Sequence, residues 1–334
     1  MKKNLNIIAE IAQGFEGNFE LSKLFIKAAA KAGADSVKFQ LVYADELSTS
    51  DYQYYGLFKE LEMEDSKWKL LKDYASSLSI QFIVDVFGDK SLATAVNIGI
   101  DTVKVHGTDV TNIGLLEAIS SSSIKKVILG VGGAYWSEIK KALEVLKNKQ
   151  LVLLCGFQGY STKTEDNHVN RMNVIKAKAK GIHVNFQMGF ADHPGEEKFA
   201  STICLVAIGA GAEVIEKHLT MGKVMEMEDF ESALNPDEFQ EFITQLKTGK
   251  KAIGSYVEEE DFGMSEDEKS YRKNVLRDVV ARREIAKGET LNIQNVTLKR
   301  TAMTDTIKQL ELVLKKKVKY SIQKNQPISN KDIN

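Results

Sequence analysis

Three stretches of the sequence share one pattern, in which a glycine is followed two positions later by an acid and then by a short apolar run ending in polar side chains. The stretches cover residues 33–40, 99–106 and 211–218. An apolar run of this length after a glycine is typical of a buried β-strand that follows a helix. Side chains alternate along a strand, so polar residues two positions apart share a face. The pattern therefore predicts three strands that deliver polar pairs to the same end of a sheet.

The rest of the first 250 residues continues the alternation of strand and helix. The predicted strands, each followed by a helical pattern, lie at residues 6–12, 36–41, 81–85, 102–106, 126–130, 151–155, 182–188 and 211–218. Eight such units in about 250 residues favour a closed (β/α)8 TIM barrel over an open doubly wound sheet. A polar and aromatic insertion at residues 45–62 is a candidate lid.

The composition changes near residue 254. Acidic runs at residues 258–261 and 266–268 indicate a linker with little to bury. A repeat follows, with residues 285–291 echoed by residues 322–328, and it predicts a second, small unit. The expected division is a barrel at residues 1–254, an acidic linker at residues 255–278 and a C-terminal domain at residues 279–334.

Charge and composition exclude several classes of function. The 334 residues carry a formal net charge of −1, which gives no electrostatic reason to bind nucleic acid or an anionic membrane. Two cysteines make no disulfide framework, and no stretch resembles a signal peptide or a membrane span. We expect a cytoplasmic enzyme with a small-molecule substrate.

In a TIM barrel the active site lies at the carboxyl ends of the strands. The polar residues predicted there are Glu10, Lys38 with Gln40, Asp85, Lys104 with His106, Asp109, Asp192, His193, and Glu216 with His218. Lysine ammonium groups suit a carboxylate or a phosphate, and Glu10 suits a base or a group that orients water. His193 and His218 follow neighbouring strands, so their imidazoles can converge on one divalent metal. Alternatively, the histidines are structural and the charges form ion pairs at the rim.

Several of these residues stand in longer motifs that resemble a known family. The motifs are residues 8–11, residues 32–40, Lys104, Asp109 with residues 111–112, residues 192–193 and residues 215–220. Together they resemble the bacterial sialic acid synthase (N-acetylneuraminate synthase-like) family. Members condense phosphoenolpyruvate with an open-chain acyl-amino hexose, such as N-acetylmannosamine, to a nonulosonic acid and phosphate. The resemblance implies a TIM barrel followed by an antifreeze-like (SAF, β-clip) domain.

The resemblance also implies roles for individual residues. His193 and His218 would bind the metal, expected to be Mn²⁺ with Mg²⁺ or Co²⁺ as alternatives, and Glu10 would be the catalytic carboxylate. Lys38, Gln40 and Lys104 would hold phosphoenolpyruvate. Further substrate contacts are expected from Thr108, Asp109, Gln158, Tyr160, Asp192, Glu216, Asp229 and Arg300. Arg300, in the small domain, would reach the barrel of a partner subunit, which implies a homodimer.

Several positions depart from the family pattern, among them residues 14–17, 155–157 and 301–302. Where the family has small hydroxyl residues that hold the phosphate, this sequence has Asp85, Gly107, Gly130 and Ala191. Losing these donors weakens phosphate binding unless Thr108 or backbone amides compensate. The acceptor sugar and the metal stay open, as do two other functions: a Schiff-base aldolase using Lys38 or Lys104, and a noncatalytic sugar-binding barrel.

Overall fold

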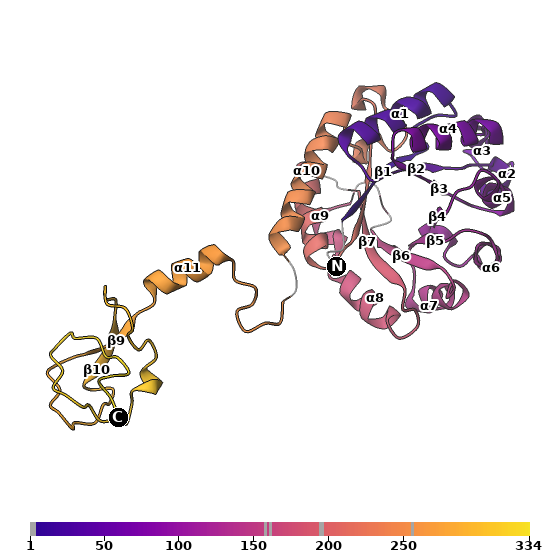
Figure 1. The fold of residues 1–334 in the computed structure, drawn as a ribbon. Helices are drawn as coiled ribbons and strands as arrows, with labels where there is room; N and C mark the ends of the chain where they lie inside the picture. Colours follow the sequence, from indigo (N-terminus) through magenta and orange to yellow (C-terminus); the bar gives the residue numbers. More distant parts are fainter. Residues whose placement is uncertain (1–4, 157–158, 160–161, 194–196, 255–256) are drawn as a thin grey trace. The chain divides into compact units, whose positions relative to one another are not determined.

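Eight parallel strands form a closed barrel, as the sequence predicts (Figure 1). The computed structural model describes residues 5–334 except 157–158, 160–161, 194–196 and 255–256. The barrel closes because β1 pairs with both β2 and β8, so that Glu10 lies beside Lys38 on one side and His218 on the other. The strands are β1 (Asn6–Ala12), β2 (Ser36–Gln40), β3 (Gln81–Asp85), β4 (Thr102–Val105), β5 (Lys126–Gly130), β6 (Gln150–Cys155), β7 (Phe186–Asp192) and β8 (Val214–His218).

Helices surround the strands. The helix that follows each strand around the barrel is, in order, α1 (Phe19–Ala32), α4 (Asp65–Ser77), α5 (Asp89–Asn97), α6 (Ile113–Ser121), α7 (Trp136–Val145), α8 (Arg171–Ala179), α9 (Ala200–Gly209) and α10 (Pro236–Ile253). The glycines of the shared sequence pattern, Gly33, Gly99 and Gly211, end three helix-to-strand turns with φ of 87°, 78° and 102°. A residue with a Cβ rarely adopts this left-handed conformation, which explains the glycine in each copy.

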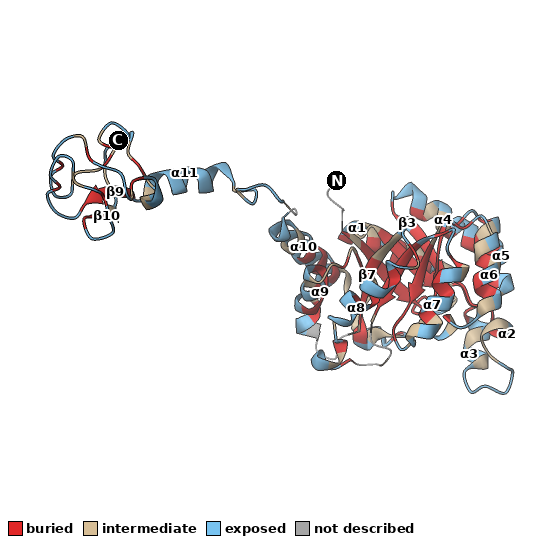
Figure 2. Cartoon of the chain, turned by 90° about the horizontal axis from the view of Figure 1, so that it is seen from below, coloured by how far each residue is buried: buried red, intermediate tan, exposed pale blue. Residues whose placement is uncertain are grey.

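The barrel carries two apolar layers, and its strands are almost entirely buried (Figure 2). The outer layer lies between strands and helices. A smaller cluster fills the inside of the barrel and consists of Ile8, Ile83, Ile128, Val152, Leu154, Ala191 and Val214. Two residues further along their strands, the same alternation places Glu10, Asp85 and Glu216 on the inner face. The charged residues of the predicted site therefore sit directly above an apolar plug.

The seventh strand differs from its prediction. It was expected at residues 182–188, but β7 spans Phe186–Asp192 and the preceding residues form a turn. His183 is buried in that turn, where its Nδ1 accepts a hydrogen bond from the backbone N–H of Asn185. Pairing with β6, in which Leu151 lies opposite Phe186, sets the start of the strand. The shift makes Asp192 the last strand residue and turns its side chain to the outer face.

The insertion at residues 45–62 forms two short helices, α2 (Ala44–Leu47) and α3 (Tyr55–Glu60). Glu46 anchors it, because its carboxylate accepts hydrogen bonds from the backbone N–H groups of Lys90 and Ser91 at the start of α5. Negative charge at a helix N-terminus is favourable. The aromatic rings of Tyr52 and Tyr54 remain exposed.

The chain divides into two compact units, Met1–Ser255 and Tyr256–Asn334. The expected acidic linker contains a helix that the sequence analysis did not predict, α11 (Glu266–Val275), capped by Ser265 and with no buried residue. The second unit holds a small apolar core around the antiparallel strands β9 (Asp278–Ala281) and β10 (Val296–Lys299). No helix in the described part of the chain is long and apolar enough to cross a membrane.

The sequence repeat of the small unit corresponds to a structural repeat. Ile285 and Ile322, the first residues of the two copies, exchange backbone hydrogen bonds of 2.9 Å and are both buried in the core. Gly288 and Asn325, three residues on, both have positive φ and make the tight turns. The two copies therefore use the same local conformation and pair with each other.

Candidate active site

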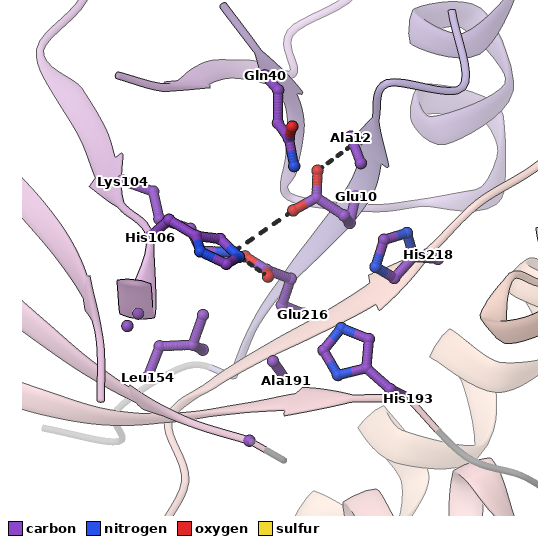
Figure 3. A pocket seen from close by; sticks show the side chains of 13 residues that line it. Glu10, Ala12, Gln40, Lys104, His106, Leu154, Ala191, His193, Glu216 and His218 are labelled. Atoms are coloured by element: carbon purple, nitrogen blue, oxygen red, sulfur yellow. Dashed lines mark hydrogen bonds and ion pairs between the residues drawn. The ribbon is translucent and has the colours of Figure 1, made fainter. Parts of the chain in front are cut away.

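A pocket opens at the carboxyl ends of the barrel strands, where the sequence predicts the site (Figure 3). Seven of the eight barrel strands contribute residues to its wall. The lining residues are Glu10, Ala12, Gln40, Lys104, His106, Gly107, Gly130, Leu154, Gly156, Ala191, His193, Glu216 and His218. The polar residues predicted from strand alternation thus meet in one cavity, except Lys38, which is fully buried and does not line it.

At the base of the pocket, two lysines and three carboxyl groups form one buried cluster, which we call the ionic cluster: Glu10, Lys38, Asp85, Lys104 and Glu216. Lys38 forms an ion pair with Glu10, donates a 2.7 Å hydrogen bond to Asp85 Oδ1, and lies 3.7 Å from Glu216 Oε2. Lys104 donates a 2.7 Å hydrogen bond to Glu216 Oε1 and lies 3.7 and 3.8 Å from Glu10 and Asp85. Both lysines are therefore already surrounded by carboxylates.

The two glutamates of the ionic cluster respond to it in opposite ways. Burial raises the pKa of Glu10 from 4.5 to about 8. Lys38 opposes this rise, and the negative charge of Glu216 adds to it. Burial would also raise the pKa of Glu216, but Lys104 and Lys38 outweigh it and hold that pKa at about 2. For Lys104, burial is outweighed by Asp85, Glu216 and Glu10, so its pKa lies well above 10.5. At neutral pH the cluster thus contains one protonated carboxyl, Glu10, beside a fixed carboxylate and a fixed ammonium.

His193 and His218 lie next to each other above the cluster, with ring centroids 5.2 Å apart. His218 Nδ1 is 3.7 Å from Asp229 Oδ2, which brings that predicted substrate residue to the edge of the site. Burial lowers the pKa of His193 to about 4 and that of His218 well below 6.5. Both rings are therefore neutral at physiological pH, the form in which imidazole binds metal.

One side of the pocket wall is built from residues with little or no side chain: Gly107, Gly130, Gly156 and Ala191. Their backbones approach each other closely. A Cβ on Gly130 would lie 2.6 Å from the backbone nitrogen of Gly107, and one on Gly156 would lie 2.8 Å from the carbonyl oxygen of Ala191. The described lining residues include no hydroxyl group, so this side of the wall offers backbone rather than side-chain hydrogen bonds.

Other predicted residues are not among the lining residues of the pocket. Thr108 and Asp109 belong to a 3-10 turn, Gly107–Asp109, where Thr108 hydrogen-bonds His106 and Asp109 at the rim. Burial raises the pKa of Asp109. Arg300 is exposed in the small unit and donates a 3.4 Å hydrogen bond to the carbonyl of Val275. Gln158 and Tyr160 lie outside the described residues, and the insertion at residues 45–62 contributes nothing to the described wall.

Asp192 is placed differently from the expectation. It was predicted to contact substrate, but it is not among the lining residues; its Oδ2 accepts a 2.9 Å hydrogen bond from Lys217, and both side chains are fully buried. The two residues face the helices, because they occupy outward positions at the ends of β7 and β8. Asp192 is therefore one partner of a structural ion pair.

Sequence reasoning also left out residues that the structure brings to the site. Gln13 donates a 2.7 Å hydrogen bond to the side-chain oxygen of Gln40 and so fixes its orientation. Leu154 and Ala12 line the wall without polar chemistry. Strand alternation from Val152 would have placed Leu154 on the inner face, whereas nothing in the sequence pairs Gln13 with Gln40.

The fold and the pocket define the class: a (β/α)8 barrel with a charged, partly apolar pocket at the strand ends where barrel enzymes carry their active sites. The chain belongs to the NeuB family, whose model matches residues 25–258, and a SAF domain matches residues 277–334. The family that the sequence motifs resemble and the expected fold are both confirmed.

Relatives and solved structures agree with this placement. An N,N'-diacetyllegionaminic acid synthase of Campylobacter jejuni is 31% identical over 324 residues, which cover 90% of this chain and 92% of the relative. A pseudaminic acid synthase of the same species is 28% identical over 312 residues, 88% of this chain and 86% of the relative. The crystal structure of the N-acetylneuraminic acid synthetase of Leptospira borgpetersenii, in complex with citrate, has a TM-score of 0.73 and 28% identity, covering 81% of this chain and 92% of that one.

Proposed function

We propose that this chain is a nonulosonic acid synthase that condenses phosphoenolpyruvate with an open-chain acyl-amino hexose and releases phosphate. The observation that supports it most is the convergence of Glu10, Lys104, His193, Glu216 and His218 in one pocket at the strand ends. Named members of the family are synthases of such acids. The acceptor class follows from the same relatives.

Glu10 is the proposed proton carrier. In the reaction the electron pair of the enol double bond joins C3 of phosphoenolpyruvate to the aldehyde carbon, and the aldehyde oxygen takes up a proton. Water then adds to C2 and loses a proton, and the C2–O bond to phosphate breaks as the new C2 hydroxyl becomes the keto group and gives its proton to the departing phosphate. A carboxyl group with a pKa of about 8 is protonated at rest, so Glu10 can donate the first proton and accept the second. Its Oε1 accepts a 2.7 Å hydrogen bond from the backbone N–H of Ala12, and its Oε2 contacts the Lys38 ammonium, so the position of the carboxyl group is fixed.

The lysines are proposed to position the ligand electrostatically. Lys104 lines the pocket, and its high pKa keeps it positively charged throughout the reaction. Lys38 lies one layer deeper, within reach of Glu10 and Asp85, and fixes the position of Glu10. A Schiff-base aldolase needs a neutral lysine amine, whereas the pKa of Lys104 is shifted in the opposite direction. Failure of borohydride to trap pyruvate on the protein is therefore the expected result.

A divalent metal is proposed at His193 and His218. Two neutral imidazoles with ring centroids 5.2 Å apart fit the coordination shell of one ion. Among the described residues, no group of three or more His, Cys, Asp or Glu side chains is placed to bind a metal, so water or substrate would fill the remaining positions, as in open catalytic sites. When bound, Mn²⁺ or a similar ion would polarise the sugar carbonyl. Asp229 is placed to orient His218.

The proposed function is tested by measuring phosphate release. The purified protein is incubated with phosphoenolpyruvate, Mn²⁺ and a panel of acyl-amino hexoses, including N-acetylmannosamine and diamino analogues. Release that depends on one sugar is expected, together with its loss in Glu10→Gln. Asp73→Asn, which removes an exposed carboxylate on α4, is the control and should behave as the wild type. Phosphate release that is independent of any sugar would contradict a synthase.

A further inference from the structure

Asp85 has an unusual place in the ionic cluster. It is the last residue of β3, it is fully buried, and its carboxylate contacts both lysines. Oδ1 accepts the 2.7 Å hydrogen bond from Lys38, and Oδ2 lies 3.8 Å from the ammonium of Lys104. No described donor hydrogen-bonds Oδ2. Asp85 therefore occupies the side of the lysines that faces β3 and β4, at the base of the pocket.

Both lysines at the base of the pocket are already engaged by carboxyl groups. Lys38 contacts Asp85 and Glu10, and Lys104 contacts Glu216, so carboxyl groups already surround both ammonium groups. A phosphorylated ligand would therefore have to compete with these carboxyl groups for the two ammonium groups.

The rest of the wall does not compensate. Gly107, Gly130 and Ala191 offer no side-chain donor, and the described lining residues carry no hydroxyl group. The lysines are thus the strongest donors for an anion, and charge-assisted bonds from lysine are worth about twice a neutral hydrogen bond. Asp85 competes for these same donors.

We propose that Asp85 sets the affinity of the pocket for phosphorylated ligands by acting as an internal counter-anion, which occupies Lys38 and Lys104 and weakens the binding of these ligands. This inference rests on the proposed function only in taking the enol phosphate as the natural ligand. It makes Asp85 a positioning residue that acts through the two lysines. Removing its charge frees one positive charge at the base of the pocket without changing the shape of the side chain.

The test compares Asp85→Asn with the wild type by isothermal titration with inorganic phosphate at pH 7 and low ionic strength. A like charge within about 4 to 6 Å shifts an ionic equilibrium by one or more powers of ten, so the variant should bind phosphate about tenfold tighter or more. Asp73→Asn removes the same charge from the surface and should leave the affinity unchanged. Equal or weaker phosphate binding by folded Asp85→Asn overturns the proposal.

A second measurement does not depend on the variant folding. The wild type should bind phosphate with a Kd of about 1 mM or weaker, equivalent to about −4 kcal/mol. Micromolar binding by the wild type also overturns the proposal. If turnover is found, Asp85→Asn should lower the KM for phosphoenolpyruvate while the KM for the sugar stays constant; a purely structural role would change both or neither.

The outcomes separate this inference from the proposed function. Tighter phosphate binding in Asp85→Asn, with no sugar-dependent phosphate release from either protein, supports the counter-anion and contradicts the synthase. Sugar-dependent phosphate release, with equal phosphate affinity in Asp85→Asn and the wild type, supports the synthase and contradicts the counter-anion.

Discussion

The buried pair formed by Asp192 and Lys217 gives a sharp prediction, because its two possible roles have opposite signatures. The Lys217 ammonium donates a 2.9 Å hydrogen bond to Asp192 Oδ2, and both side chains are fully buried between strands and helices. At an effective dielectric constant of about 20, charges at this distance attract by roughly 6 kcal/mol. Replacing Lys217 by Met leaves the carboxylate buried and unpaired, and protonation of Asp192 limits the loss. We expect the free energy of unfolding to fall by about 3 to 5 kcal/mol.

The loss should depend on pH in a defined direction. Burial raises the pKa of Asp192 and Lys217 opposes that rise, so removing Lys217 raises the pKa further. A carboxyl with a raised native pKa stabilises the fold fully below its unfolded pKa, and that contribution is lost as the pH rises through the native value. Lys217→Met should therefore be less destabilised at pH 5 than at pH 8.

Urea unfolding followed by tryptophan fluorescence suits this test. Both tryptophans, Trp68 and Trp136, lie in the barrel unit, so the signal reports the barrel alone. The double variant Asp192→Leu with Lys217→Met removes both charges and should recover much of the loss, which measures the coupling. Wild-type stability in Lys217→Met would refute a structural pair. If Asp192→Asn folds with wild-type stability but binds ligand more weakly, Asp192 is a substrate contact, as the sequence predicted.

Three further predictions concern the pocket. Because the pKa of Glu10 is raised from 4.5 to about 8, the native protein retains a proton that the unfolded chain releases. The stabilising contribution of this proton should be lost as the pH rises from about 4.5 to 8. Glu10→Gln should flatten the dependence of the free energy of unfolding on pH, as measured by denaturation in metal-free buffer. His193→Ala and His218→Ala should each lose bound Mn²⁺, measured by elemental analysis, with unchanged circular dichroism; full occupancy in either would remove that ring from the ligand set. Gly130→Ser should cost about 1 to 3 kcal/mol of stability, since its Cβ would lie 2.6 Å from a backbone nitrogen, whereas Gly209→Ala, with open space around it, should not; equal stability of the two would contradict the close backbone approach.

Strand alternation predicted the polar face of the pocket from sequence. Lys104 with His106, and Glu216 with His218, line the cavity as their spacing indicates. The alternation rule succeeds because these strands are short, bounded by glycine turns and buried on both faces. The same rule explains Lys217, which lies between two inward residues and faces the helices.

The particular ion pairs that the lysines form did not follow from strand alternation. Lys104 and Glu216 are 112 positions apart and meet only because the barrel closes. Whether they form an ion pair depends on how deep in the barrel each side chain lies, and a strand pattern does not show this. Asp192 was misplaced for a related reason: Ile182 and Val184 imitate a strand, but pairing with β6 starts β7 at Phe186.

The formation of a new carbon–carbon bond tests the central claim most directly. The protein is incubated with Mn²⁺, N-acetylmannosamine or a diamino analogue, and phosphoenolpyruvate labelled with ¹³C at C3, and the products are followed by NMR and mass spectrometry. The proposed synthase should give a product that contains the whole sugar and shows the label as a methylene carbon bonded to the former aldehyde carbon. The product should be absent with Glu10→Gln. Labelled pyruvate as the sole product, or unchanged phosphoenolpyruvate with every sugar at saturating concentration, would contradict the account.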